Sequence, residues 1–91
     1  MPTLHGLPGT NGPIEAVRAS SVTGFLNALR TSEAVTTARE EGAINVWLAD
    51  GLYRCERYRF RTTVNSRAFT SKRKVAAWLR EQLPQIEKGR Q

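Results

Sequence analysis

The chain has 91 residues, one cysteine, one histidine and a net charge of +6 at neutral pH. This length predicts one domain with a modest core, and a single cysteine excludes an internal disulfide. No stretch approaches the roughly 18–20 apolar residues that span a bilayer, and the first residues lack the basic start and apolar run of a signal peptide. We therefore expect a small cytoplasmic domain.

The positive charge lies in the second half of the chain. Residues 1–51 carry three basic and five acidic residues, whereas residues 52–91 carry eleven basic and three acidic ones, a net charge of +8. Such one-sided charge is typical of proteins with a polyanionic partner, most often nucleic acid. The alternative is an ordinary solvated surface on a basic protein.

Glycine, proline and helical spacing predict how the chain is divided. Residues 1–13 are rich in glycine and proline, which predicts a flexible tail, and residues 87–91 are polar, which predicts a frayed end. Residues 14–86 would form the domain. Its first part reads as helical, with Ser20 or Ser21 as a cap and with Ser32 able to cap a second short helix.

A β-hairpin is predicted around Asp50-Gly51, because both positions of a tight hairpin turn favour a positive φ. The strands would be residues 43–49 and 52–62, with Ile44, Val46, Leu48, Tyr53 and Cys55 on one apolar face. The alternation then slips, and a β-bulge at residues 56–57 would return Tyr58 and Phe60 to that face.

The predicted bulge places the arginines of the second strand together on the opposite face, beside Trp47. They are Arg54, Arg57, Arg59 and Arg61. Four arginines are rarely buried without partners, so this face would be open and Trp47 would stack on a ligand. The alternative is that the N-terminal helices cover the face and make Trp47 a core residue.

The remaining elements are a short third strand and a helix. A four-residue turn at Thr63–Ser66 would lead into a strand over residues 67–70, which adds Phe69 to the apolar face. The helix would run from Lys72 to about Leu83, capped by Thr70 or Ser71, with an apolar stripe at helical spacing. Its first turn carries Lys72, Arg73 and Lys74, where the helix dipole disfavours cations, a placement compatible with phosphate binding.

No catalytic group of residues is visible in the sequence. One histidine, one cysteine and scattered carboxylates match neither a zinc site nor a nucleophilic triad, so we expect no enzyme activity, no metal and no cofactor. Cys55 would be a buried small hydrophobe.

Three strands followed by a helix that opens Phe69-Thr70-Ser71-Lys72-Arg73-Lys74-Val75-Ala76-Ala77-Trp78 resemble the arm-site DNA-binding domain of phage-type tyrosine integrases. The resemblance covers residues 43–83 and includes Tyr58-Arg59. It implies a sheet laid in the major groove with the helix packed behind it. The same helix start also resembles the last helix of double-stranded-RNA-binding domains, whose lysines contact phosphates.

We therefore predict an α+β fold with one or two N-terminal helices, a three-stranded antiparallel meander and a C-terminal helix on one sheet face. The predicted function is non-enzymatic nucleic-acid binding, with duplex DNA favoured. The alternative is a small phage-type accessory or inhibitor protein that binds an acidic surface of a host protein. The predicted contact residues are Trp47, Arg54, Arg57, Arg59, Arg61, Lys72, Arg73 and Lys74.

Overall fold

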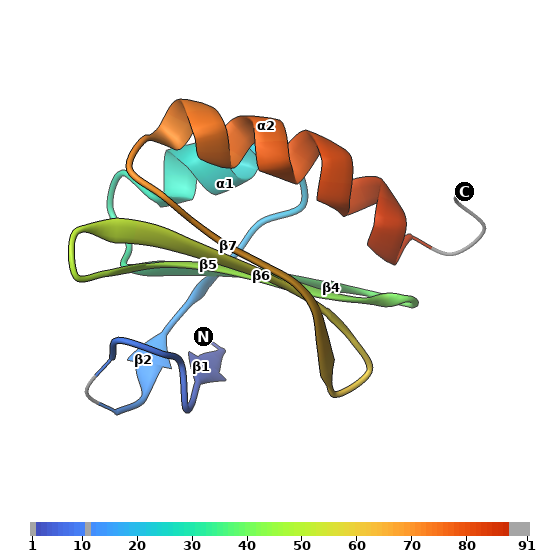
Figure 1. The fold of residues 1–91 in the computed structure, drawn as a ribbon, viewed down its shortest axis with the longest axis horizontal. Coiled ribbons are helices and arrows are strands. Elements are labelled where there is room, and N and C mark those ends of the chain that lie inside the picture. The colour runs from blue at the N-terminus through green and yellow to red at the C-terminus, as the bar shows by residue number, and fades with distance from the viewer. Residues whose placement is uncertain (1, 11, 88–91) are drawn as a thin grey trace.

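The computed structural model describes residues 2–10 and 12–87, which form two sheets, two α-helices and a short 3₁₀ helix (Figure 1). In chain order the elements are β1 (Thr3–Leu4), β2 (Ile14–Glu15), β3 (Val17–Arg18), α1 (Val22–Ala28), β4 (Ala34–Arg39), β5 (Gly42–Ala49), β6 (Leu52–Arg59), β7 (Thr62–Phe69), α2 (Lys72–Gln82) and η1 (Leu83–Ile86). Among the described residues, no helix is long and apolar enough to cross a membrane.

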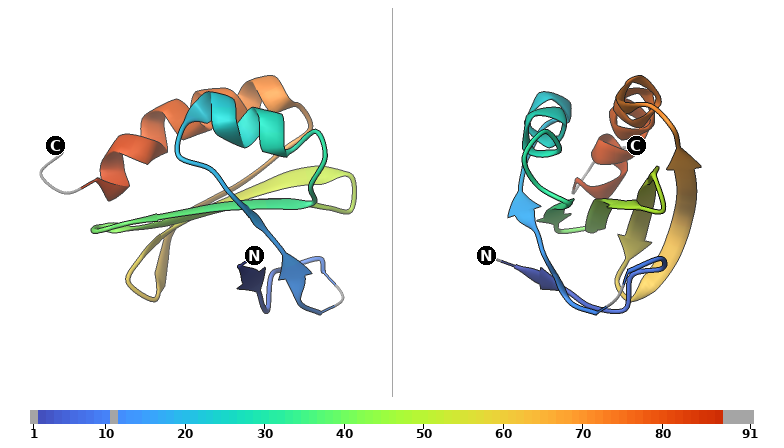
Figure 2. Two further views of the ribbon diagram at one scale, coloured as in Figure 1. Left: turned by 180° about the vertical axis from the view of Figure 1, so that it is seen from behind. Right: turned by 90° about the vertical axis from the view of Figure 1, so that its left-hand side faces the viewer.

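The main sheet has five strands in the order β3-β4-β5-β6-β7. Its strands pair antiparallel, except that the two-residue β3 runs parallel to β4. Both helices lie on one face of this sheet, and the N-terminal segment with the small β1-β2 sheet lies on the other (Figures 1 and 2). Each face of the central strands is therefore covered.

The predicted three-stranded meander was wrong, because the structure has a five-stranded mixed sheet and a separate two-stranded one. The main error lies at Ala34–Arg39, which we assigned to a second short helix and which forms strand β4. The β-branched run Val35-Thr36-Thr37 favours a strand, and pairing along β5 from Ala34↔Trp47 to Arg39↔Gly42 stabilises it.

The hairpin at Asp50-Gly51 is confirmed. Asp50 and Gly51 have φ values of 55° and 75°, as a tight hairpin turn requires. The pairs Ala49↔Leu52, Trp47↔Arg54 and Val46↔Cys55 follow from the two-residue turn, as predicted. The apolar face of this hairpin is therefore the one that the sequence indicates.

The β-bulge is on a different strand from the one predicted. The β5–β6 pairing continues without a shift to Ala43↔Tyr58, whereas the β6–β7 register shifts between Arg57↔Asn65 and Tyr58↔Thr63. The extra residue is therefore Val64, in β7. Because β6 itself is regular, Tyr58 stays on the face of Arg54, and Arg57 falls on the helix face.

The turn after β6 was also misplaced. The structure turns at Phe60-Arg61, so Arg59 pairs with Thr62 and Tyr53 pairs with Phe69. The residues that we assigned to a turn, Thr63–Ser66, lie within β7. Phe60, which we expected in the core, is 79% exposed.

The larger core lies between the sheet and the helices. Strand residues such as Val46 and Cys55 pack against Phe25 of α1 and against Val75 and Leu79 of α2, all of them fully buried. Helix α2 begins after Ser71, whose hydroxyl accepts from the Lys74 N–H at 3.4 Å, and its predicted apolar stripe is buried. The sheet face under the helices therefore contributes more buried side chains than the opposite face.

A second, smaller core lies on the opposite face. Trp47 is 1% exposed there and packs with Leu7, Ala16, Ala34 and Ala49. We predicted residues 1–13 as a flexible tail; the structure places residues 2–10 against the sheet, and their mobility in solution stays a prediction.

Candidate nucleic-acid interface

Trp47 does not reach a ligand-binding surface. Its indole Nε1 donates a 3.0 Å hydrogen bond to the Pro8 carbonyl oxygen, and its ring lies under the N-terminal segment. The interpretation of Trp47 as a core residue is therefore the correct one, although an extended segment covers it rather than helices. The open arginine face that we predicted around Trp47 is absent.

Arg54 shares the face of Trp47 and is half-buried. Its guanidinium lies 4.0 Å from the Asp50 carboxylate, and its Nε is buried without a hydrogen-bond partner. A cavity of about 190 Å³ lies beside it, and Pro8, Glu56 and Ser66 also line this cavity. Pro8 brings the N-terminal segment to the same cavity as Arg54, whose side chain is 32% exposed.

Arg57 points to the opposite face and has a partner in α2. Its Nε donates a 2.6 Å hydrogen bond to Oε1 of Gln82, which is buried. A cation held in this way fixes the end of α2 against β6. Arg54 and Arg57 therefore lie on different faces, which separates two of the four arginines predicted to act together.

Arg59 ends β6 and Arg61 is the second residue of the β6–β7 turn, and both are exposed. Between them Phe60 has φ of 57° and projects its ring into solvent, with the Arg59 guanidinium carbon 6.0 Å from the ring centroid. A positive φ on a bulky residue costs about 1–3 kcal/mol, and burial of the ring does not offset that cost here. The turn bends away from both helices (Figure 1).

The first turn of α2 contributes a second group of cations. Lys72 is half-buried, and Arg73 and Lys74 are exposed. Trp78 Nε1 donates a 2.9 Å hydrogen bond to Asn65 Oδ1, which aligns α2 with β7.

The alignment of α2 with β7 also determines the neighbour of Lys74. Lys74 lies one helical turn before Trp78, a displacement of about 6 Å along α2, and Arg67 lies two residues after Asn65, about 7 Å along β7. Since α2 runs back along the strand, this spacing predicts that Arg67 and Lys74 lie on the same stretch of this edge.

We name these cations the β7-edge surface. It comprises Arg59, Arg61, Arg67, Lys72, Arg73 and Lys74. The ion pair between Arg54 and Asp50 includes none of these six cations. Arg67 is the one charged residue of β7, and β7 is the last strand of its sheet.

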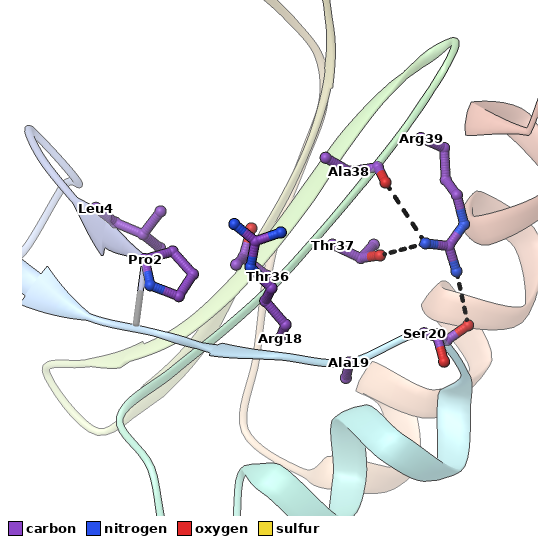
Figure 3. A pocket seen from close by; sticks show the side chains of 9 residues that line it. All are labelled: Pro2, Leu4, Arg18, Ala19, Ser20, Thr36, Thr37, Ala38 and Arg39. Atoms are coloured by element: carbon purple, nitrogen blue, oxygen red, sulfur yellow. Dashed lines mark hydrogen bonds between the residues drawn. The ribbon is translucent and has the colours of Figure 1, made fainter.

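A pocket lies at the other side of the sheet, where β3 leaves β4 (Figure 3). Its volume is about 400 Å³, and its lining includes Arg18 and Arg39. Arg39 donates to Thr37 Oγ1 at 3.0 Å and to the Ser20 carbonyl oxygen at 3.1 Å. These contacts tie the end of β4 to the start of α1, so we read Arg39 as a structural residue.

Two titratable groups of β6 have shifted pKa values. Burial raises the pKa of the Cys55 thiol to about 12. The pKa of Tyr58 is raised, first by burial and then by the Glu56 carboxylate, which accepts a hydrogen bond from the Tyr58 hydroxyl. Both groups stay neutral at physiological pH, which makes the thiol a poor nucleophile. Residues 2–10 and 12–87 contain no cluster of three potential metal ligands.

No protein-family model, curated protein or solved structure matches the chain. Function is therefore argued from the residues themselves. Sequence reasoning missed Arg67 and Phe60 as surface residues, because it placed Phe60 in the core and ended the sheet with a four-residue strand. The signal available for Arg67 was its place in the basic half of the chain.

Proposed function

We propose that the protein binds nucleic acid, with duplex DNA as the preferred form, through the β7-edge surface. The observation that carries the proposal is that six cations border one edge strand and that the Arg54–Asp50 ion pair includes none of them. Unpaired arginine and lysine side chains bind phosphates and release the counterions condensed on the duplex. Such binding needs no catalytic group and no cofactor.

The edge of the sheet, rather than its face, is the surface offered to a duplex. The face that the integrase resemblance would place in the major groove is covered in this structure by the N-terminal segment, with Trp47 beneath it. The proposed contact therefore differs from the one that the resemblance implies. Arg54 and Arg57 are excluded from it, and Arg67 is added.

The spacing of the cations suits a linear polyanion. Strand β7 has eight residues, so it separates Arg61 from the first turn of α2 by about 25 Å. On one DNA strand this distance corresponds to about seven phosphates at about 3.4 Å each. The two cation groups would thus hold phosphates at the two ends of one contact.

A direct titration tests the proposal. Fluorescently labelled duplex DNA, duplex RNA and single-stranded DNA of mixed sequence, each of 20 nucleotides, are titrated at about 50 and 150 mM salt. We expect duplex DNA to bind most tightly and its affinity to fall steeply with salt. Absence of binding to all three at the lower salt would refute nucleic-acid binding, and pull-down with an acidic protein surface would then be the appropriate experiment for these cations.

A further inference from the structure

The turn between β6 and β7 carries an exposed aromatic ring that packing does not explain. Phe60 is 79% exposed, whereas the other exposed large hydrophobic residues of the described chain, Leu48 and Val64, are 44% and 43% exposed. It belongs to neither hydrophobic core. A phenylalanine in water gains nothing from its ring, so stability alone does not account for this residue.

The backbone makes Phe60 a costly choice at this position. Phe60 is the first residue of a two-residue turn and has φ of 57°, a conformation that Gly, Asn and Asp adopt with less strain. The other tight turn of this sheet with such a φ uses Asp50-Gly51, the expected residues. A strained and exposed residue is typical of a position at which a functional contact stabilises the strain.

The neighbours of Phe60 indicate the chemistry of its partner. Arg59 and Arg61 precede and follow Phe60 in the chain, both exposed, and the Arg59 guanidinium carbon lies 6.0 Å from the ring centroid. An apolar ring between two cations matches a nucleotide strand, in which a flat base lies between charged phosphates. A purely apolar partner would leave both guanidiniums without counterions.

The position of the turn gives the ring access to a partner. The β6–β7 turn bends away from the β4–β5 turn and from the helices, as Figure 1 and the left view of Figure 2 show. The register shift at Val64 adds local twist to the two-stranded ribbon. The ring therefore sits at the end of a projecting ribbon rather than on a flat surface.

We propose that Phe60 is a base-stacking residue: its ring lies against a nucleobase exposed at a kinked step, a mismatch or a strand end, while Arg59 and Arg61 hold the flanking phosphates. This inference rests on the nucleic-acid binding proposed above and names the base contact within it. Aromatic rings stack on bases in sequence-tolerant binding, and apolar wedges enter base steps in bent duplexes.

Substitution of Phe60 tests the inference, with a 20-base-pair duplex as the probe, intact or with one mismatched pair at its centre. Wild type should bind the mismatched duplex several-fold more tightly, because the exposed base is already partly unstacked. Phe60→Ala should weaken binding to the mismatched duplex by about 5- to 100-fold, remove the preference and leave the salt dependence unchanged. Phe60→Trp should keep the preference.

Phe60→Asn serves as a second variant, because Asn adopts the positive φ of this position with less strain, so this variant should stay folded. Equal affinities of wild type, Phe60→Ala and Phe60→Asn for both duplexes would overturn base stacking while leaving phosphate binding by the cations intact. Failure of wild type to bind any duplex would overturn both proposals. Binding to anionic lipid vesicles instead of duplex DNA would identify the ring as a membrane contact and would also overturn the inference.

Discussion

Trp47 Nε1 donates a hydrogen bond to the carbonyl oxygen of Pro8, 39 residues earlier in the chain. This contact joins the N-terminal segment to the centre of the main sheet. Leu7 follows the same pattern, since it is 7% exposed and packs with Trp47. The segment therefore acts as the cover of one sheet face.

Removal of this cover gives the first prediction. In a Trp78→Phe background, Trp47 should emit at short wavelength and resist acrylamide quenching. A chain that begins at Ile14 should show red-shifted, quenchable emission and a lower melting temperature. Leu7→Ala in the full chain should cost roughly 2–3 kcal/mol, as large-to-small core changes do. Unchanged emission after truncation would instead show a dispensable tail.

The second prediction separates two neighbouring arginines on the same strand face. Arg57→Ala leaves the buried Gln82 oxygen without its donor and should cost about 1–3 kcal/mol of unfolding free energy. The salt dependence of DNA binding should not change. Arg59→Ala should do the reverse, with little effect on stability and a flatter salt dependence. A flatter salt dependence for Arg57→Ala together with a loss of stability for Arg59→Ala would contradict the assignment of Arg57 to structure and Arg59 to binding.

The hairpin at Asp50-Gly51 could be predicted because its signal is local: two turn residues that tolerate positive φ and an alternating pattern on both sides. The helix after Ser71 could be predicted because its signals are also local: a capping serine and an apolar stripe at helical spacing. Strand β4 was missed, because its β-branched run is only three residues long and its pairing with β5 lies outside the local pattern. Tertiary pairing overrides weak helical propensity in such segments.

The candidate site was harder to predict, because a shift of one residue changes every face beyond it. We placed the extra residue in β6, whereas it is Val64 in β7, and this error moved Tyr58 and Phe60 onto the wrong face. The cover over Trp47 was invisible for a different reason. Glycine and proline in residues 1–13 predict a flexible chain, but they do not exclude a few apolar side chains that pack against a sheet.

Gly42 provides the third prediction. It has φ of 153°, and a Cβ there would collide with the carbonyl oxygen of Tyr58 and lie 3.1 Å from Ile86 Cγ2. Gly42→Ala should therefore cost about 2–3 kcal/mol by forcing β5 and β6 apart. Gly51→Asn is the matched control, because Asn tolerates positive φ and the space beside Gly51 is open. Equal melting temperatures of the two variants would contradict this packing.

The fourth prediction concerns pH. Burial raises the pKa of the Cys55 thiol from 9.0 to about 12, so the folded state favours the neutral thiol. This stabilisation is complete below about pH 9 and is lost as the pH rises toward 12, by up to about 1.4 kcal/mol per pH unit. Denaturant unfolding of wild type and Cys55→Val between pH 8 and about 10.5 should show the smaller decline in the variant. Parallel declines would contradict burial of the thiol.

The salt dependence of duplex binding tests the β7-edge surface most directly. Arg67→Gln together with Lys74→Gln should flatten the slope of log K against log salt by about 1–2, at about 0.9 per phosphate contact. The control is Arg18→Gln with Arg30→Gln, which removes the same charge outside this surface, with Arg18 on the strand at the opposite side of the sheet. We predict an unchanged slope for the control; equal slopes for the two double variants would contradict binding through the β7-edge surface.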